Sequence, residues 1–320
     1  MTRPASPVDA ADSGPPGPDS AWSNTDSRFT EPAPSGQIPG RTALRIGWRR
    51  QALLLAAVMA CLTVFLLARE MAHNPHVAAD WRATSQGRLE LVYTTVPGLK
   101  DQVGRELVSI ETGDGAEVAF DALALTHSAR WLVDDAHRRQ LVKARLKVAR
   151  AAEAGHLVLV FADGRRIDVA PNPRGYASLG AMFWLLSAFA MVLFLVGWIV
   201  PLVQPHFRNV LYAVMALAQA GELLLAAVGS VPALTLPSAL VLREHTVLTL
   251  LDLVTGAAIV HSTAVHPLRL RWTGLPLLLA WGATAEFAFS VVTLGNPHAW
   301  WWPQSFMLLE GAIAIALLSS

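Results

Sequence analysis

The chain has 320 residues, of which 53% are hydrophobic and only 15% are charged, and its mean hydropathy is +0.40. A soluble globular protein carries about 25% charged residues, so this composition predicts a membrane protein. The 25 basic and 24 acidic residues nearly balance, and no basic run or RNA-binding motif points to a nucleic-acid partner. The single cysteine, Cys61, excludes an internal disulfide and a cysteine metal site. Because Cys61 lies in the middle of an apolar run, we expect a buried, inert thiol.

The N-terminal segment, residues 1–44, is predicted to be a disordered cytoplasmic tail. Residues 1–40 contain eight Pro, four Gly and six Ser with almost no apolar periodicity, so they bury too little surface to offset the entropy of ordering.

The first predicted transmembrane helix is residues 45–68. Its uncharged run, residues 51–68, is about the minimum length that crosses a bilayer core of roughly 30 Å. A cleaved signal peptide is the alternative, but the long preceding tail and the length of the run favour an uncleaved anchor.

Residues 69–178 mix charges with short alternating runs and predict an extracytoplasmic α+β domain. Residues 88–96 and 106–110 are predicted strands, and residues 156–170 predict a β-hairpin around Gly164. A helix is predicted over residues 131–154, with Gly155 as its C-cap. Its apolar positions recur every three or four residues and are Leu132, Ala136, Leu141, Ala144, Val148 and Ala151.

Residues 179–320 are predicted to form a five-helix membrane bundle. The apolar stretches lie near residues 180–202, 209–230, 245–265, 273–294 and 303–320. With the first anchor they make about six transmembrane helices, so the expected fold class is a multi-pass α-helical membrane protein. The α+β domain would lie between the first and second of these helices.

Arginines in the short loops predict the orientation, because positive charge is retained in the cytoplasm. Seven lie on the proposed inner side and one on the outer side; they are Arg41, Arg45, Arg49, Arg50, Arg208, Arg269 and Arg271 inside, and Arg243 outside. We therefore expect a bacterial inner membrane protein with both termini cytoplasmic. Trp300, Trp301 and Trp302 would then lie at the outer interface. The chain stops at Ser320, where the sixth span should emerge, so we expect a longer protein with a cytoplasmic continuation.

Each of the last four predicted spans contains one carboxylate, and these are the candidate ligand- or proton-binding residues: Glu222, Asp252, Glu286 and Glu310. Charged groups are costly in hydrocarbon and normally face a protein interior or a water-filled cavity. Counted from the centre of each span, the four lie at nearly the same depth, so they could converge on a cation or a cationic ligand.

The alternative is that each acid is hydrogen-bonded across a helix interface. The expected partners at helical spacing are Gln219 for Glu222, Thr255 for Asp252 and Ser290 for Glu286.

Signatures of enzymes, metals and cofactors are absent from these 320 residues. There is no P-loop, dinucleotide-binding, zinc-protease or serine-hydrolase motif. The membrane-region histidines do not form a ligand-spaced pair on one helix face; they are His245, His261, His266 and His298. We expect no cofactor, no metal site and no enzymatic activity in this chain.

The order of the segments resembles the N-terminal membrane sensor (input) region of bacterial multi-span sensor histidine kinases. Residues 250–272, LLDLVTGAAIVHSTAVHPLRLRW, are also similar to membrane segments of these kinases, with an early Asp and a His-Pro-x-Arg exit. The phosphoacceptor helix and the ATP-binding motifs of the kinases are absent from the 320 residues. The resemblance implies a homodimeric chain that senses an unknown small ligand or ion and signals to a cytoplasmic partner.

Two other functions remain open beside a signalling input module embedded in the lipid bilayer. A small ion-coupled transporter could use the four carboxylates, although the spans have no obvious inverted repeat and few internal Gly or Pro breaks. A structural subunit could recruit partners through its outer domain.

Overall fold

The computed structural model describes residues 39–113, 115–126, 128, 132, 134–231, 234–265, 274–294 and 301–319. The predictions for the tail before residue 39, for Arg269 and Arg271, for His266 and His298, and for Trp300 lie outside these residues. Residues 48–320 form one compact unit.

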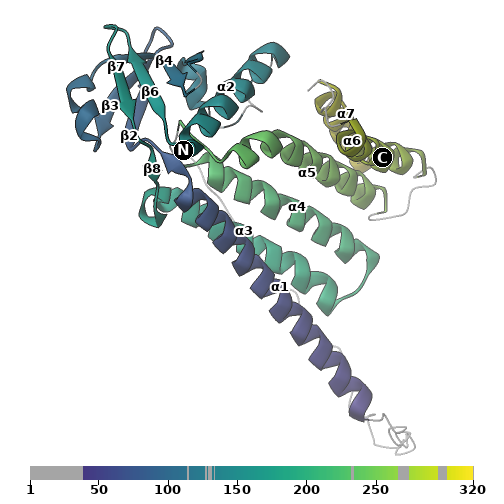
Figure 1. Cartoon of the computed structure of the whole chain (residues 1–320). Coiled ribbons are helices and arrows are strands. Elements are labelled where there is room, and N and C mark those ends of the chain that lie inside the picture. The colour runs from purple at the N-terminus through teal and green to yellow at the C-terminus, as the bar shows by residue number, and fades with distance from the viewer. Residues whose placement is uncertain are drawn as a thin grey trace, which may run out of the picture. The chain divides into compact units, whose positions relative to one another are not determined.

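Long helices make up most of the described chain (Figure 1). Their bounds are α1 Pro39–His73, α2 Asp135–Glu153, α3 Gly180–Val203, α4 Phe207–Gly229, α5 Ser238–Ala264, α6 Gly274–Leu294 and α7 Trp301–Ser319. Within the described residues, four helices are long and apolar enough to cross a membrane, namely α1, α3, α4 and α5. The remaining two C-terminal helices, α6 and α7, are also apolar, with 21 and 19 residues.

A small antiparallel sheet domain lies between α1 and α3 in the chain. Its strands are β2 Ala79–Ala83, β3 Leu89–Thr94, β4 Glu106–Thr112, β5 Glu117–Ala119, β6 Leu157–Phe161 and β7 Arg166–Val169. They run in the order β2-β3-β4-β6-β7, and β5 pairs with β4 beside that path. The predicted strands and the hairpin at Gly164, whose φ is +81°, are confirmed.

One helix, α2, closes the core of the sheet domain. Alternate strand residues such as Leu89, Leu159 and Phe161 point inward, and Val148 and Ala152 of α2 pack on them. The apolar stripe of α2 and the apolar face of the sheet thus bury each other from water, and this burial stabilises the domain.

The predicted start of α2 at residue 131 is wrong by four residues. The helix starts at Asp135 because the side chain of Asp134 accepts a hydrogen bond from the Ala136 backbone N–H at 3.0 Å, as an N-cap does. Ala136 is consequently exposed rather than part of the buried face. Gly155 caps the other end with φ +87°, as predicted.

Two very short strands close the base of the sheet domain. Strand β1, Pro75–His76, follows α1 directly and pairs with β8, Asn172–Pro173, which precedes α3. The chain therefore enters and leaves the domain at neighbouring positions.

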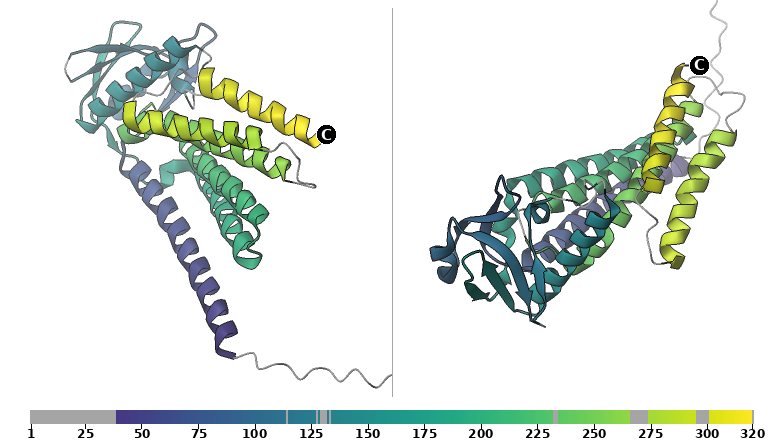
Figure 2. Two further views of the ribbon diagram at one scale, coloured as in Figure 1. Left: turned by 90° about the vertical axis from the view of Figure 1, so that its right-hand side faces the viewer. Right: turned by 90° about the horizontal axis from the view of Figure 1, so that it is seen from above.

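The helices α3, α4 and α5 pack side by side in chain order, and α6 and α7 both pack on α5 (Figure 2). Close approach in this bundle uses small residues: a Cβ at Gly197 of α3 would lie 3.2 Å from Leu217 Cγ of α4. Helix α5 begins seven residues before the predicted span, because its first turns pack against α2 of the sheet domain.

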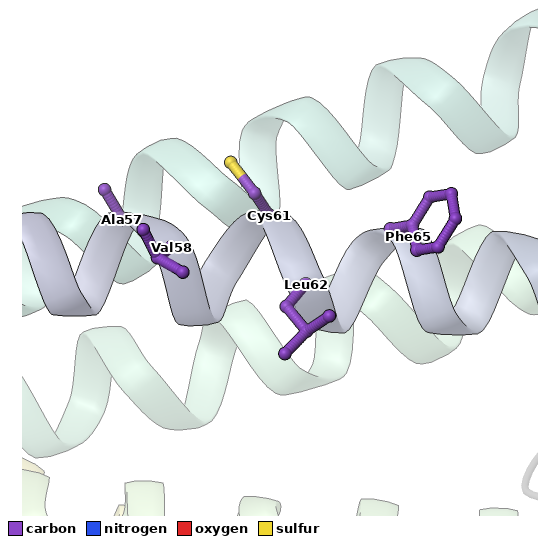
Figure 3. Close-up of a pocket in the computed structure, with 5 residues that line it drawn as sticks. All are labelled: Ala57, Val58, Cys61, Leu62 and Phe65. Carbon is purple, nitrogen blue, oxygen red and sulfur yellow. The ribbon is translucent and has the colours of Figure 1, made fainter.

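Helix α1 presents much of its apolar surface outward. Its C-terminal end packs on the bundle through Ala68 and Met71. The expectation that Cys61 is buried is wrong: the thiol is exposed beside a shallow hollow lined by Ala57, Val58, Leu62 and Phe65 (Figure 3). An apolar helix face that is left uncovered in this way is suited to contact with lipid.

Candidate functional site

The end of α2 and the start of α5 are joined by two hydrogen bonds. The carboxylate of Glu153 accepts one from the Ser238 backbone N–H at 3.1 Å and one from the Ser238 hydroxyl at 3.2 Å. The first N–H groups of a helix have no partner within the helix and carry partial positive charge. Glu153 therefore caps α5 from the sheet domain.

A buried arginine on α2 lies beside this junction. Arg145 of α2 is 8% exposed, and its Nη2 donates to the carbonyl of Ala124 at 3.1 Å and to that of Thr126. Burial lowers the pKa of Arg145, and the negative charge of Glu244 on α5 partly offsets this. The arginine pKa starts so high that the guanidinium stays charged, so Arg145 is a buried positive charge of the sheet domain that acts electrostatically on Glu244 of α5.

A cavity of about 200 Å³ lies at this junction. Trp81, Thr126 and Arg145 line it from the sheet domain, and Gly229 and Leu236 line it from the end of α4 and the following loop. Its walls thus come from both parts of the molecule, so its shape depends on how they are joined.

The exposed side of α2 forms a groove with strand β5. Two adjoining hollows of about 470 and 170 Å³ follow this groove and share Ala119, Gln140 and Ala144. Lys143 and Lys147 stand one turn apart along its rim, together with the exposed Arg139.

The acidic residues of the groove already have partners. Glu117 pairs with Arg166 at 3.2 Å, and Asp121 accepts a hydrogen bond from the Leu123 backbone N–H at 2.9 Å. The groove, which we call the α2 groove, therefore presents net positive charge.

Helix contacts place the four predicted carboxylates at similar levels of the bundle. Gly221, next to Glu222, lies against Leu251, next to Asp252. In α6, Thr284, two residues before Glu286, donates a hydrogen bond to the carbonyl of Leu253 at 3.3 Å. Glu310 of α7 contacts Gly256, one turn after Asp252.

The four side chains nevertheless have different surroundings. Glu222 accepts the predicted hydrogen bond from Gln219 at 3.0 Å. The other two expected hydrogen bonds do not form: the Thr255 hydroxyl has no hydrogen-bond partner, and the Ser290 hydroxyl donates to the Phe287 carbonyl. Glu286 is exposed on the surface of α6 and Glu310 is buried. Glu310 is therefore placed against Gly256 of α5, on the helix face that also carries Asp252 one turn earlier, whereas Glu286 is on the exposed side of α6.

The residues of the α2–α5 contact were not among the sequence candidates. Arg145 does carry a signal, since it continues the buried stripe of Leu141, Val148 and Ala152 at helical spacing. Glu153 and Ser238 carry none, because they are 85 residues apart and meet only in the folded chain.

Among the described histidines, His261 has a partner from another helix. Its Nδ1 accepts a hydrogen bond from the Trp281 indole of α6 at 3.2 Å. Within the described residues, no group of three His, Cys, Asp or Glu side chains could hold a metal ion.

Comparison of the chain with protein-family models, with curated proteins and with solved structures finds no match.

Proposed function

We propose that the chain is the input module of a bacterial membrane signal-transduction protein of the two-component histidine-kinase type. In this proposal six helices cross the inner membrane, both termini are cytoplasmic and the sheet domain lies outside the cytoplasm. The observation that carries the proposal is that α2 is used in two places: one side lines the α2 groove, and its C-terminal end holds the start of α5 through the hydrogen bonds of Glu153 with Ser238.

The proposed stimulus is an anionic ligand that binds the α2 groove. Its positive rim, provided by Arg139, Lys143 and Lys147, favours negative charge. A ligand shifts a conformational equilibrium only through unequal affinity for the two states. We propose that binding shifts α2, that α5 follows because Glu153 of α2 caps it and the two helices pack together, and that a second copy and a cytoplasmic partner receive the change.

Hydrogen–deuterium exchange of the full chain in lipid nanodiscs tests this coupling. Glu153→Gln removes the carboxylate that caps α5 and keeps the size of the side chain. We expect faster exchange not only at Ser238 but also further along α5, near Gly256. Arg150→Gln, an exposed change on α2, is the matched control and should leave α5 unaffected. Faster exchange confined to the first turn of α5 would mean that the sheet domain is attached to α5 but does not transmit a conformational change along it.

Ion-coupled transport is the second candidate, and one observation favours it. Glu310 is buried inside the bundle with no hydrogen-bond partner for either oxygen, as expected for a site that takes up an ion during a cycle. Reconstitution into liposomes tests it: transport requires H⁺ or Na⁺ flux in the unmodified chain that Glu310→Gln abolishes.

A further inference from the structure

The carboxyl group of Glu310 lies in the contact between α5 and α7. The residue is 1% exposed, and both of its carboxyl oxygens are buried without a hydrogen-bond partner. Its Oε2 occupies the space where a side chain at Gly256 would begin, and its Cδ lies 3.0 Å from that position. The absence of a side chain at Gly256 is what allows α7 to place a carboxyl group directly against α5.

No basic side chain of the neighbouring helices is positioned to neutralise Glu310. Helices α6 and α7 contain no Lys or Arg, and the only one in α5 is Arg243. Arg243 precedes Gly256 by thirteen residues, which is about 20 Å along a helix that rises 1.5 Å per residue. At that distance an ion pair cannot form.

Among the described residues of α4, α5 and α6, the titratable groups on the level of Glu310 or along α5 are acids and histidines, apart from Arg243. Asp252 precedes Gly256 by one turn on the same face of α5, Glu222 lies at the same level on α4, and Glu286 of α6 is exposed. On α5, His245 lies nearer its N-terminus, and His261 accepts the hydrogen bond from Trp281. Apart from Arg243, no Lys or Arg belongs to this set.

Oxygen atoms gather at this point of α5. The Thr255 hydroxyl is buried without a hydrogen-bond partner, and one carboxylate oxygen of Asp252, Oδ2, is buried beside it on the same helix face. An isolated carboxylate in an apolar interior is costly. Carboxylate and hydroxyl oxygens as donor atoms suit a hard cation or a proton rather than a soft metal.

We propose that Glu310, together with Asp252 and Thr255, binds a monovalent cation, either H⁺ or Na⁺, in the contact between α5 and α7. The cation neutralises Glu310 and so allows α7 to remain packed on Gly256. Its loss leaves a bare carboxylate in the bundle and drives α7 away from α5. This site goes beyond the signalling role and stands or falls independently of it.

Thermal unfolding of the full chain in nanodiscs tests the site and identifies the cation. One series varies pH at constant Na⁺, and another replaces choline chloride by sodium chloride at constant pH. In the unmodified chain we expect Tm to rise as the concentration of the bound cation, H⁺ or Na⁺, increases. Dependence on pH alone identifies the proton, and dependence on Na⁺ at constant pH identifies Na⁺.

Two variants provide the matched comparison. Glu310→Gln makes the side chain permanently neutral. The Tm of this variant should therefore stay near the value of the unmodified chain at saturating cation, and it should no longer depend on the cation concentration. Glu286→Gln changes the exposed acid at a similar level and should retain the full dependence. If the unmodified chain and Glu310→Gln respond identically to both cations, the site does not exist.

Carbodiimide labelling provides a readout that needs no variant, in case Glu310→Gln does not fold. Carbodiimides react with protonated carboxyl groups, and mass spectrometry of peptides locates the modified residue. We expect labelling of Glu310 that decreases as pH rises, or as Na⁺ increases if Na⁺ is the bound cation. Labelling of Glu310 that responds to neither cation would overturn the proposal.

Discussion

Asn74 and Thr235 are 161 residues apart in the chain and are joined by a hydrogen bond. The Asn74 amide donates to the Thr235 carbonyl at 3.2 Å, and the Thr235 hydroxyl donates to the Pro75 carbonyl at 2.9 Å. Both side chains are buried. The loop between α4 and α5 is thereby fixed to the point where α1 ends and the sheet domain begins.

Replacing Asn74 should therefore loosen the junction. Asn74→Ala leaves the buried Thr235 carbonyl without its donor, which costs about 1–3 kcal/mol. Urea unfolding in detergent micelles measures the change. Asn172→Ala, which removes an exposed amide hydrogen-bonded to the Ala170 carbonyl, should stay within about 0.5 kcal/mol. Equal effects of the two substitutions would contradict a structural role of the buried pair.

Arg145→Gln should destabilise the contact of α2 with α5. The substitution weakens two hydrogen bonds to buried backbone carbonyls and removes the positive charge that acts on Glu244. A buried polar group left without its partner costs about 1–3 kcal/mol, and a loss of this size is expected. Hydrogen exchange at the start of α5 reports the loss. The exposed Arg150→Gln should show no comparable change, and a similar response would argue against a structural role of Arg145.

The base of the sheet domain should weaken at acidic pH through His76. Burial lowers the pKa of His76 below 6.5, the hydrogen bond with the Asn172 carbonyl at 3.0 Å opposes this, and the charge of Arg174 reinforces it. The unfolded chain therefore takes up the proton first, so stability is complete above pH 6.5 and decreases as pH falls through 6.5 toward the folded pKa.

Hydrogen exchange at β1 and β8, measured on either side of pH 6.5, checks this direction. We expect faster exchange on the acidic side in the unmodified chain and a weaker pH effect in His76→Gln. Slower exchange at acidic pH would show that the protonated ring is stabilised instead.

Gly256→Ala should displace Glu310 from α5. The new Cβ would overlap Oε2 of Glu310. Overpacking costs about 1–3 kcal/mol, whereas the alanine gains up to about 1 kcal/mol in helix propensity, so a net loss of about 1 kcal/mol is expected. Gly282→Ala in α6 meets no atom within 4 Å and should be neutral or stabilising by that gain. If the Gly256→Ala and Gly282→Ala chains are equally stable, Glu310 does not contact Gly256.

Labelling of single cysteines in intact cells tests the orientation of the chain. In a Cys61→Ala background, Ser85→Cys lies in an exposed turn of the sheet domain and Gln204→Cys in the exposed connection between α3 and α4. The proposed topology predicts that a membrane-impermeant maleimide labels the cysteine at 85 and not the one at 204. The reverse pattern would invert the topology.

Local patterns were sufficient to predict the elements of the sheet domain. The alternation that defines β3, β4 and β6 and the glycines at 155 and 164 act over a few residues. The predicted start of α2 is too early because the apolar periodicity includes Leu132, whereas the helix begins only after Asp134, whose side chain caps it.

The candidate site was predictable only in part, because depth and rotation are different properties of a helix. Counting residues placed the four acids at similar levels, which the contacts of Gly221, Thr284 and Gly256 support. Helices that are apolar on every side carry no signal for rotation, so the exposure of Glu286 and the burial of Glu310 could not be foreseen.

The pairing of β1 with β8 has a mechanical consequence. Pro75 lies opposite Pro173, and backbone hydrogen bonds from Arg174 to Asn74 and from Gly175 to Ala72 continue this pairing to the C-terminal end of α1. Because the segments that lead from α1 and into α3 are hydrogen-bonded to each other, a tilt of the sheet domain displaces both helices together. The domain cannot turn about a single strand, and its motion reaches the bundle as a paired displacement of two helices.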